Sequence, residues 1–404
     1  MNQFRVRAAV SPLRRDVSAA PSVLPTVDDL IATLRPSEPV HCLRPTVMTA
    51  AAREFVADFP GDVLYAVKCN PEPAVLRALR ALWAGGVRHF DCASAREVAL
   101  VRSMFADAEI HFMHPAKSRA AIRAAYAQHG VRDFVLDSAD ELAKIVDETD
   151  GAADLGLLVR LAMPSGEAVL DLSGKFGAFE DDAALLLRAA RMRAARVGVS
   201  FHVGSQCMDP LAYRRALESV GHVIAGAGVA VEMIDVGGGF PVRYPDLDPP
   251  PLGAFFAEIE VGLAALGLPG TRLWAEPGRA LVAAGGSVVV QVQLRKGDVL
   301  YVNDGVYGSL SDAGRLEFQF PSRAVGRDNA LMAFAFYGPT CDSADYMRGP
   351  FWLPEDIGEG DWIEIGQLGA YGGCLRTGFN GFDRAYLVEV RDLPLQAEAL
   401  ALAA

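Results

Sequence analysis

The chain has 404 residues, a net charge of -12, and a composition that is 51% hydrophobic and 22% charged. This length allows two domains with a large core, and these proportions are those of a globular protein. The negative charge argues against nucleic acid or an anionic membrane as a partner. No apolar run reaches the roughly 18 residues of a membrane-spanning helix, and the early arginines precede no apolar signal segment.

The six cysteines are scattered and form no CxxC pair. This pattern predicts reduced thiols in a cytoplasmic enzyme, rather than a disulfide framework or a zinc site, and we expect no metal. We expect four of the thiols to lie in or near the core, namely Cys42, Cys69, Cys92 and Cys207.

Short apolar runs alternate with helical patterns over residues 39–281. The predicted strands are Val63–Lys68, His89–Ser94, Ile110–Pro115, Asp133–Asp137, Leu157–Leu161, Val199–Gly204, Met233–Gly238 and Leu273–Gly278. The predicted helices include Ala74–Trp83, Ala95–Phe105, Ser118–His129, Ala139–Glu148, Asp181–Arg193, Leu211–Ala227 and Leu252–Leu266. Eight such units favour an α/β fold with a closed (β/α)8 barrel. A doubly wound open sheet is the alternative, but no GxGxxG follows the first strand.

The segments on either side of the barrel have different patterns. Residues 1–38 are rich in Pro, Ser, Ala and Arg, and they predict a partly ordered arm that contributes a strand to a later domain. Residues 282–404 predict a β-rich C-terminal domain, because strand patterns there are separated by glycine and proline turns. We interpret Asp345–Asp356 within it as a loop.

Lys68 closes the first predicted barrel strand and is followed by a proline break at Pro71. An amine in a partly desolvated place is nucleophilic toward carbonyl groups. The alternative is a lysine that extends its amine into solvent. In a parallel barrel the chemistry lies at the carboxyl ends of the strands. The polar residues at those ends therefore decide between the two readings.

The other strand ends suggest a cofactor. Gly237, Gly238 and Gly239 follow one strand and would let backbone N–H groups approach a phosphate, unless they merely form a tight turn. Glu276 would hold a pyridine nitrogen protonated, unless it forms a structural ion pair with Arg279. His202 would stack on a flat ring, unless it is a core histidine. Lysine, phosphate cradle, carboxylate and stacking ring together predict a pyridoxal 5'-phosphate (PLP) site.

The motifs at these positions resemble those of the fold-type III PLP-dependent decarboxylases, nearest the ornithine decarboxylase branch of the ornithine, lysine and diaminopimelate decarboxylase family. They occur in order over about residues 60 to 390. They are Tyr65–Lys68, Phe90–Ser94, Lys175–Gly177, His202–Ser205, Gly237–Pro241, Glu276–Arg279, Gly338–Asp342 and Phe379–Phe382. The resemblance implies an alanine-racemase-like barrel with a C-terminal β domain, in a homodimer.

The resemblance also implies a role for each matching residue. Lys68 would hold the cofactor covalently, His202 would stack on its ring, and Glu276 would pair with the pyridine nitrogen. Asp91 and Arg160 match positions in the surrounding network. The phosphate would be held by Ser205, Gly237, Gly238, Gly239, Gly278, Arg279 and Tyr371.

Cys341 and Asp342 would enter the active site from the other subunit of the dimer. The thiol would protonate the carbon that loses CO2, and the carboxylate would contact the distal amine of the substrate. The alternative for Cys341 is an inert core thiol. Tyr307, in a stretch that follows the family well, is a further candidate for substrate binding.

The chain departs from the family pattern over residues 310–317, where ornithine decarboxylases place an acidic residue for the distal ammonium. Asp312 and Glu317 are both candidates here, and Arg315 is an unexpected cation. If Arg315 points into the pocket, a substrate with a distal carboxylate or a larger acyl group becomes possible.

We therefore predict a PLP-dependent amino-acid decarboxylase that acts on L-ornithine to give putrescine, with L-lysine as second choice. A decarboxylase of a modified or carboxylate-bearing diamino acid is the alternative within this fold. A racemase is less expected, because Cys341 and Asp342 belong to the decarboxylase pattern. The alternative of another class is a catalytically silent binding protein.

Overall fold

The computed structural model describes residues 23–80, 87–164, 168–170 and 174–396. The chain divides into two compact units. One unit consists of Met48–Arg243 and Asp248–Val282, and the other consists of the segment up to Val47, Tyr244–Leu247 and Ala283–Ala404.

The first unit contains a closed barrel of eight parallel strands in the order β11-β12-β3-β4-β5-β6-β7-β9. The strands are β3 (Asp62–Ala66), β4 (His89–Cys92), β5 (Glu109–Phe112), β6 (Asp133–Leu136), β7 (Gly156–Arg160), β9 (Arg196–Ser200), β11 (Met233–Asp235) and β12 (Arg272–Ala275). The predicted (β/α)8 fold class is thus confirmed, although most strands end a few residues before the predicted position. A short antiparallel pair, β8 (Ala168–Leu170) and β10 (Ser205–Cys207), lies outside the barrel.

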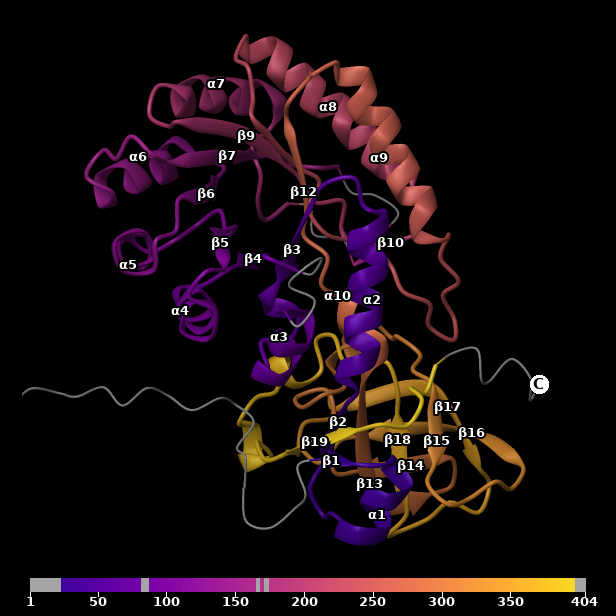
Figure 1. Cartoon of the computed structure of the whole chain (residues 1–404). Coiled ribbons are helices and arrows are strands. Elements are labelled where there is room, and N and C mark those ends of the chain that lie inside the picture. Colours follow the sequence, from indigo (N-terminus) through magenta and orange to yellow (C-terminus); the bar gives the residue numbers. More distant parts are fainter. Residues whose placement is uncertain (1–22, 81–86, 165–167, 171–173, 397–404) are drawn as a thin grey trace, which may run out of the picture. The chain divides into compact units, whose positions relative to one another are not determined.

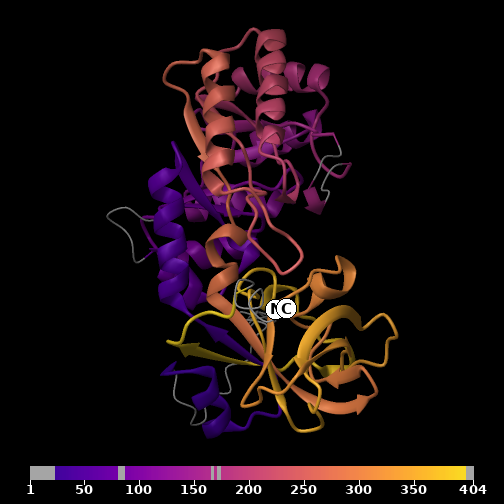
Figure 2. The same ribbon diagram turned by 90° about the vertical axis from the view of Figure 1, so that its right-hand side faces the viewer.

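Helices surround this barrel on the outside, as Figure 1 shows for α4 to α9. The helices of the unit are α2 (Pro45–Asp58), α3 (Pro73–Arg80), α4 (Ala95–Met104), α5 (Arg119–His129), α6 (Ala139–Glu148), α7 (Glu180–Arg191), α8 (Leu211–Ala227), α9 (Leu252–Leu266) and α10 (Arg279–Val282). Helices α8 and α9 run side by side (Figure 2). Within the described ranges, no helix has both the length and the apolarity needed to cross a membrane.

Three of these helices begin at a serine that follows a barrel strand. Ser94, Ser118 and Ser138 each accept a hydrogen bond from the backbone N–H three residues later, at the start of α4, α5 and α6. Such caps satisfy N–H groups that have no partner within the helix. Serine at these positions therefore marks where each strand-to-helix loop ends.

The barrel interior is arranged in layers, because alternate side chains of each strand face inward. A buried apolar cluster fills the middle: Leu64, Met113, Val135, Leu158, Met233 and Trp274. On β4 the alternation puts His89 and Asp91 on the same face, one on either side of this layer. Polar residues therefore occupy both ends of the barrel.

The second unit is built on a nine-stranded sheet with the path β1-β19-β2-β13-β14-β16-β17, and β18 pairs with both β13 and β15. The strands are β1 (Val23–Leu24), β2 (Val40–Leu43), β13 (Gly286–Lys296), β14 (Val299–Val302), β15 (Ser322–Ala324), β16 (Leu331–Tyr337), β17 (Tyr346–Pro354), β18 (Trp362–Ile365) and β19 (Tyr386–Val390). Helix α1 (Val27–Leu34) packs on it through Val27, Leu30 and Ile31. Helix α11 (Ser311–Arg315) also belongs to this unit.

One prediction in this unit was wrong. Residues 345–356, interpreted as a loop, contain strand β17, which pairs antiparallel with β16 over most of its length. The segment has few branched aliphatic residues, and long-range pairing with β16 decides its conformation. The N-terminal arm does supply a strand, since β1 pairs with β19. Residues 1–22 of the predicted arm lie outside the described ranges.

The four thiols predicted in the core, Cys42, Cys69, Cys92 and Cys207, are buried. Cys341 is exposed and Cys374 is partly exposed. All six cysteines are free thiols. Cys341 is therefore no core residue of this chain.

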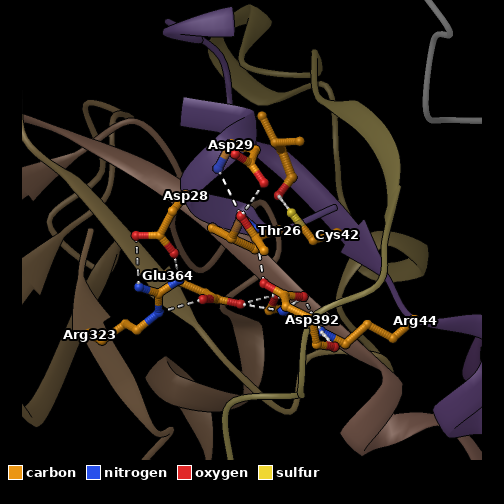
Figure 3. Close-up of polar contacts among 11 residues, drawn as sticks. Thr26, Asp28, Asp29, Cys42, Arg44, Arg323, Glu364 and Asp392 are labelled. Carbon is orange, nitrogen blue, oxygen red and sulfur yellow. Dashed lines mark hydrogen bonds and ion pairs between the residues drawn. The ribbon is translucent and has the colours of Figure 1, made fainter. Parts of the chain in front are cut away.

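A buried ion network joins the N- and C-terminal segments of the second unit (Figure 3). Arg44 is only 1% exposed, and its guanidinium donates to Glu364 Oε1 at 2.9 Å, to Asp392 Oδ1 at 2.9 Å and to Ser287 Oγ at 2.9 Å. Glu364 also accepts from Arg323 at 2.8 Å. Removal of one partner would leave charge buried without compensation, which costs far more than loss of a surface pair.

Arg44→Met should lower the free energy of unfolding by about 3–5 kcal/mol, because Glu364 and Asp392 would lose the cation between them. Arg327→Met is the matched control: Arg327 pairs with Asp356 and Asp361 at the surface, so its loss should cost about 0–1 kcal/mol. Urea unfolding of both variants measures the difference. Equal costs for the two variants would contradict the importance of the buried network.

Candidate active site

Lys68 lies just beyond strand β3, in a single 3-10 turn formed by Val67–Cys69. The strand itself ends at Ala66, whose N–H donates to Pro277 O at 3.2 Å. Lys68 thus follows the strand end by two residues instead of closing the strand as predicted. Its side chain is 40% exposed, so Lys68 is not enclosed in the barrel core.

The Lys68 amine forms an ion pair with Asp91 at the end of β4, with 3.0 Å between Nζ and Oδ2. The Asp91 side chain is fully buried, and its second oxygen, Oδ1, has no hydrogen-bond partner among the described residues. A buried acceptor without a partner is rare in proteins and indicates a ligand or water that completes it. Asp91 therefore orients the amine and retains one open acceptor.

His202 lies two residues beyond strand β9. Its Nδ1 accepts the Gly204 N–H at 3.0 Å, so a neutral ring carries its proton on Nε2. Burial, with Arg160 and Lys68 nearby, lowers the pKa of His202 well below its usual value. The ring is therefore neutral at physiological pH and suited to stacking on a planar group.

The glycines after β11 are required by close backbone packing. A Cβ at Gly237 would lie 2.2 Å from Phe201 O, and one at Gly239 would lie 2.4 Å from Gly204 O. Both residues have positive φ, +68° and +106°, which favours glycine independently of any ligand. A Cβ at Gly238 would lie 2.6 Å from Glu276 O and 3.2 Å from His202 Nε2, so this turn touches both candidate residues.

Asp235, at the end of β11, is a site residue that the sequence analysis missed. It is completely buried, and its Oδ1 accepts the Gly237 N–H at 2.9 Å. The N–H of Gly237 is therefore already taken, so an anion at this turn would have to be held by Gly238 and Gly239. The only available signal was its position immediately before Val236 and the three glycines, since a buried acid at a strand end needs a donor.

Asp235 and Glu276 form a pair of buried carboxyl groups in hydrogen-bonding contact. The Glu276 N–H donates to Gly237 O at 2.8 Å, which ties the end of β12 to the glycine turn. Burial, then the neighbouring carboxylates, raises the pKa of Glu276 well above its usual value. Burial likewise raises the pKa of Asp235, to about 6. The pair therefore retains a proton close to neutral pH.

The remaining predicted residues of the barrel unit lie at the same ends of the strands. Arg160 is the last residue of β7, and its guanidinium lies over the Phe176 ring, 5.8 Å from the centroid. Ser205 begins β10, and Arg279, which is buried, begins α10. A Cβ at Gly278 would lie 2.8 Å from Cys69 Cβ, so this turn packs directly on the segment that carries Lys68.

The other candidates belong to the second unit. The Tyr307 hydroxyl donates a short hydrogen bond to Asp342 Oδ2, which lowers the pKa of Asp342. The Cys341 backbone N–H and thiol both contact Asn380 Oδ1, at 3.0 and 3.1 Å. Asn380 was part of a family motif, but no role had been assigned to it.

Three more predicted residues of this unit complete the set. Tyr371 has a positive φ of 56°. Asp312 lies in the first turn of α11, and Glu317 follows that helix with a φ of 54°. The side chain of Arg315 lies outside the described part of the chain.

The barrel with its polar strand ends defines a class: an α/β-barrel protein with a partly exposed lysine just beyond the carboxyl end of a strand. Residues 47–283 match the family described as pyridoxal-dependent decarboxylase, pyridoxal binding domain. The chain therefore belongs to this family. It is a PLP-dependent amino-acid decarboxylase.

Individual relatives agree with this assignment. The chain is 33% identical to the lysine/ornithine decarboxylase of Selenomonas ruminantium over 84% of its length and 86% of the relative. It is 34% identical to the ornithine decarboxylase of Panagrellus redivivus, over 79% of its length and 78% of the relative. Among solved structures, the Vibrio vulnificus lysine/ornithine decarboxylase complexed with cadaverine has a TM-score of 0.78 and 31% identity, covering 91% of this chain and all of the other. The Paramecium bursaria Chlorella virus arginine decarboxylase has a TM-score of 0.79 and 27% identity, covering 90% of this chain and 99% of the other.

The residues at the barrel end fit PLP. Lys68 offers an amine on a partly exposed side chain, Asp91 a buried open acceptor, and His202 a neutral flat ring. The proton held by Asp235 and Glu276 suits contact with a ring nitrogen, which can accept or share it. Gly238 and Gly239 are the members of the glycine turn whose N–H groups would approach the phosphate.

The raised pKa of Asp235 predicts a pH-dependent loss of stability in the cofactor-free protein. A carboxyl group with a raised folded-state pKa stabilises the protein below its unfolded value of 3.8, and this contribution is lost as pH rises toward about 6. Asp235→Asn retains the acceptor for Gly237 but does not titrate. The stability of the wild type relative to this variant should fall by up to about 3 kcal/mol across this range.

Urea unfolding at several pH values between about 4 and 7.5 measures this difference. Asp140→Asn is the control, because Asp140 is an exposed carboxylate in the first turn of α6. The difference in free energy of unfolding between the wild type and Asp235→Asn should change with pH. If this difference stays constant over the range, Asp235 does not hold the proton.

Proposed function

We propose that this protein decarboxylates a basic L-amino acid, with L-ornithine as the first substrate and L-lysine as the second. The observation that carries the proposal is the neighbouring pair Cys341 and Asp342 on the second unit. A thiol that can give a proton and a carboxylate that can bind a distal ammonium are what this reaction needs from the protein, besides the cofactor. The relatives named above, which act on ornithine, lysine or arginine by their names, support a basic substrate.

The carboxylate of Asp342 is prepared to bind a cation. The Tyr307 hydroxyl donates to it, which favours the ionised form, and the Ala344 N–H donates to its other oxygen at 3.0 Å. These two donors also restrict its orientation. A substrate ammonium would therefore meet a charged and oriented acceptor.

The barrel residues have distinct tasks in this proposal. Bound PLP supplies the electron sink that the loss of CO2 from an α-amino acid requires. Lys68 is the amine that attaches it, and Asp91 orients that amine through the 3.0 Å ion pair. The neutral His202 ring covers one face of the cofactor and excludes water from it. Glu276, supported by Asp235, holds a proton at the buried end of the site.

Cys341 donates the proton that replaces the lost carboxylate. Its thiol is exposed and held 3.1 Å from Asn380 Oδ1, so the side chain has one preferred direction. Leu375, Phe379 and Phe382, in the neighbouring segments, are each more than 40% exposed. Exposed apolar side chains of this size indicate a surface that another molecule covers. We infer that a second copy of the chain covers it, so that each active site receives Cys341 and Asp342 from its partner.

Substrate profiling tests the proposed specificity. The CO2 released from L-ornithine should exceed that from L-lysine by about 10- to 200-fold in kcat/KM, because the two substrates differ by one methylene. L-arginine, meso-diaminopimelate and carboxynorspermidine complete the panel. The two carboxylate-bearing substrates test the alternative raised by Arg315.

Each outcome of this panel has a distinct meaning. Preferred turnover of meso-diaminopimelate or carboxynorspermidine would replace ornithine by a carboxylate-bearing substrate. A yellow, cofactor-loaded protein that releases CO2 from no amino acid would support the binding protein instead. A protein that remains colourless with added PLP would contradict the assignment of the site residues.

Mixing two inactive variants tests the shared site. Lys68→Ala should abolish turnover, and Cys341→Ala should strongly slow formation of the correct amine. In a mixture with exchanged subunits, half of the dimers are mixed and each has one intact site, so activity should recover to about a quarter of wild type. Each variant incubated alone is the control. No recovery despite demonstrated subunit exchange would exclude a site built from two chains.

A further inference from the structure

The end of the barrel opposite the candidate active site carries a second cluster of polar residues. His89 begins β4, and Glu109 and His111 belong to β5. Among the described residues, these three form a group whose potential ligand atoms all lie within 4.8 Å of one another. None of them has a role in the function proposed above.

The distances between the ligand atoms suit a transition-metal ion. His89 Nδ1 lies 3.0 Å from His111 Nε2 and 3.8 Å from Glu109 Oε2. Tetrahedral Zn²⁺ with bonds of about 2.0–2.1 Å separates its ligands by roughly 3.3 Å, between these two values. Shifts of a few tenths of an ångström would therefore be enough to replace the imidazole–imidazole hydrogen bond by a shared metal.

The outward nitrogen of each histidine faces a carboxylate. His111 Nδ1 lies 3.0 Å from Asp133 Oδ2, and His89 Nε2 lies 3.9 Å from Asp62 Oδ1. A metal-binding histidine almost always donates its outward N–H to a partner such as a carboxylate, which orients the ring. The 3.0 Å contact of His111 is short enough for this, whereas the 3.9 Å separation at His89 is too long for a hydrogen bond. The carboxylates are themselves held by Arg196 at 2.8 Å and Arg272 at 2.7 Å.

Access from solvent also suits a metal. Both rings are almost completely buried, whereas the Glu109 side chain is 51% exposed. Glu109 thus lies where an ion would enter from solvent.

We propose that His89, Glu109 and His111 bind one divalent transition-metal ion, Zn²⁺ in the first place, at the N-terminal end of the barrel. The ion joins β4 to β5 and leaves a fourth position for water. Because β4 also carries Asp91, the metal stabilises the strand that orients Lys68, but takes no part in the chemistry. The metal site does not depend on which amino acid is the substrate. The metal site and the proposed substrate can therefore each be wrong without affecting the other.

Equilibrium dialysis of the PLP-loaded protein against Zn²⁺ tests the site, with thermal unfolding as a second readout. Wild type should bind one Zn²⁺ per chain. Glu109→Gln should bind this ion at least about tenfold more weakly, and His89→Gln should not bind it. Zn²⁺ should raise the unfolding temperature of wild type. Mg²⁺ should not, because it requires oxygen ligands.

Two control variants separate this site from other zinc ligands. Glu260→Gln and His222→Gln change exposed residues on α9 and α8, and both should keep the wild-type stoichiometry. Exposed thiols, Cys341 included, would bind the same amount of Zn²⁺ in all variants. Such binding would therefore not produce the expected difference between wild type and the site variants. Glu109→Gln alters an exposed side chain and should fold; its metal-free unfolding temperature verifies this. Equal Zn²⁺ binding by wild type and His89→Gln, or no binding at all, would overturn the proposal.

Discussion

The ion pair between Lys68 and Asp91 is the interaction on which this account depends. Lys68 lies on a 3-10 turn after β3, and Asp91 lies on the neighbouring strand β4. Because Asp91 is buried and Lys68 is partly exposed, the pair holds the amine at the edge of the barrel without burying the whole lysine side chain. The second carboxylate oxygen of Asp91, Oδ1, has no hydrogen-bond partner among the described residues. A bound ligand can therefore supply the missing hydrogen bond.

The barrel keeps this site apart from the histidine cluster by a layer of apolar side chains. Alternation along β4 puts His89 below and Asp91 above the layer that contains Trp274 and Met233. Both ends therefore carry buried charged or polar groups, and at the active-site end one oxygen of Asp91 has no hydrogen-bond partner among the described residues. The same constraint that makes a parallel barrel useful for catalysis at one end makes the other end suitable for a structural metal.

Much of this arrangement could be predicted from the sequence. The alternation of strands and helices indicated the barrel, and the polar strand ends predicted that Lys68, His202 and Glu276 would lie at its carboxyl end. The role of Asp235 could not be predicted, because an acid before a glycine turn does not reveal that its partners are a backbone N–H and a second carboxyl group. The cluster of His89, Glu109 and His111 was missed for a related reason: its residues come from two strands, and only the pairing of β4 with β5 brings them together. Strand β17 was missed because its conformation depends on pairing with β16 rather than on local pattern.

The central claim is that Lys68 is the residue that binds PLP covalently. Reduction of the PLP-loaded protein with borohydride makes the attachment permanent, and digestion followed by mass spectrometry locates it. The account predicts a pyridoxyl group on the peptide that contains Lys68 and on no other lysine. A pyridoxyl group on another lysine, with Lys68 unmodified, would contradict it.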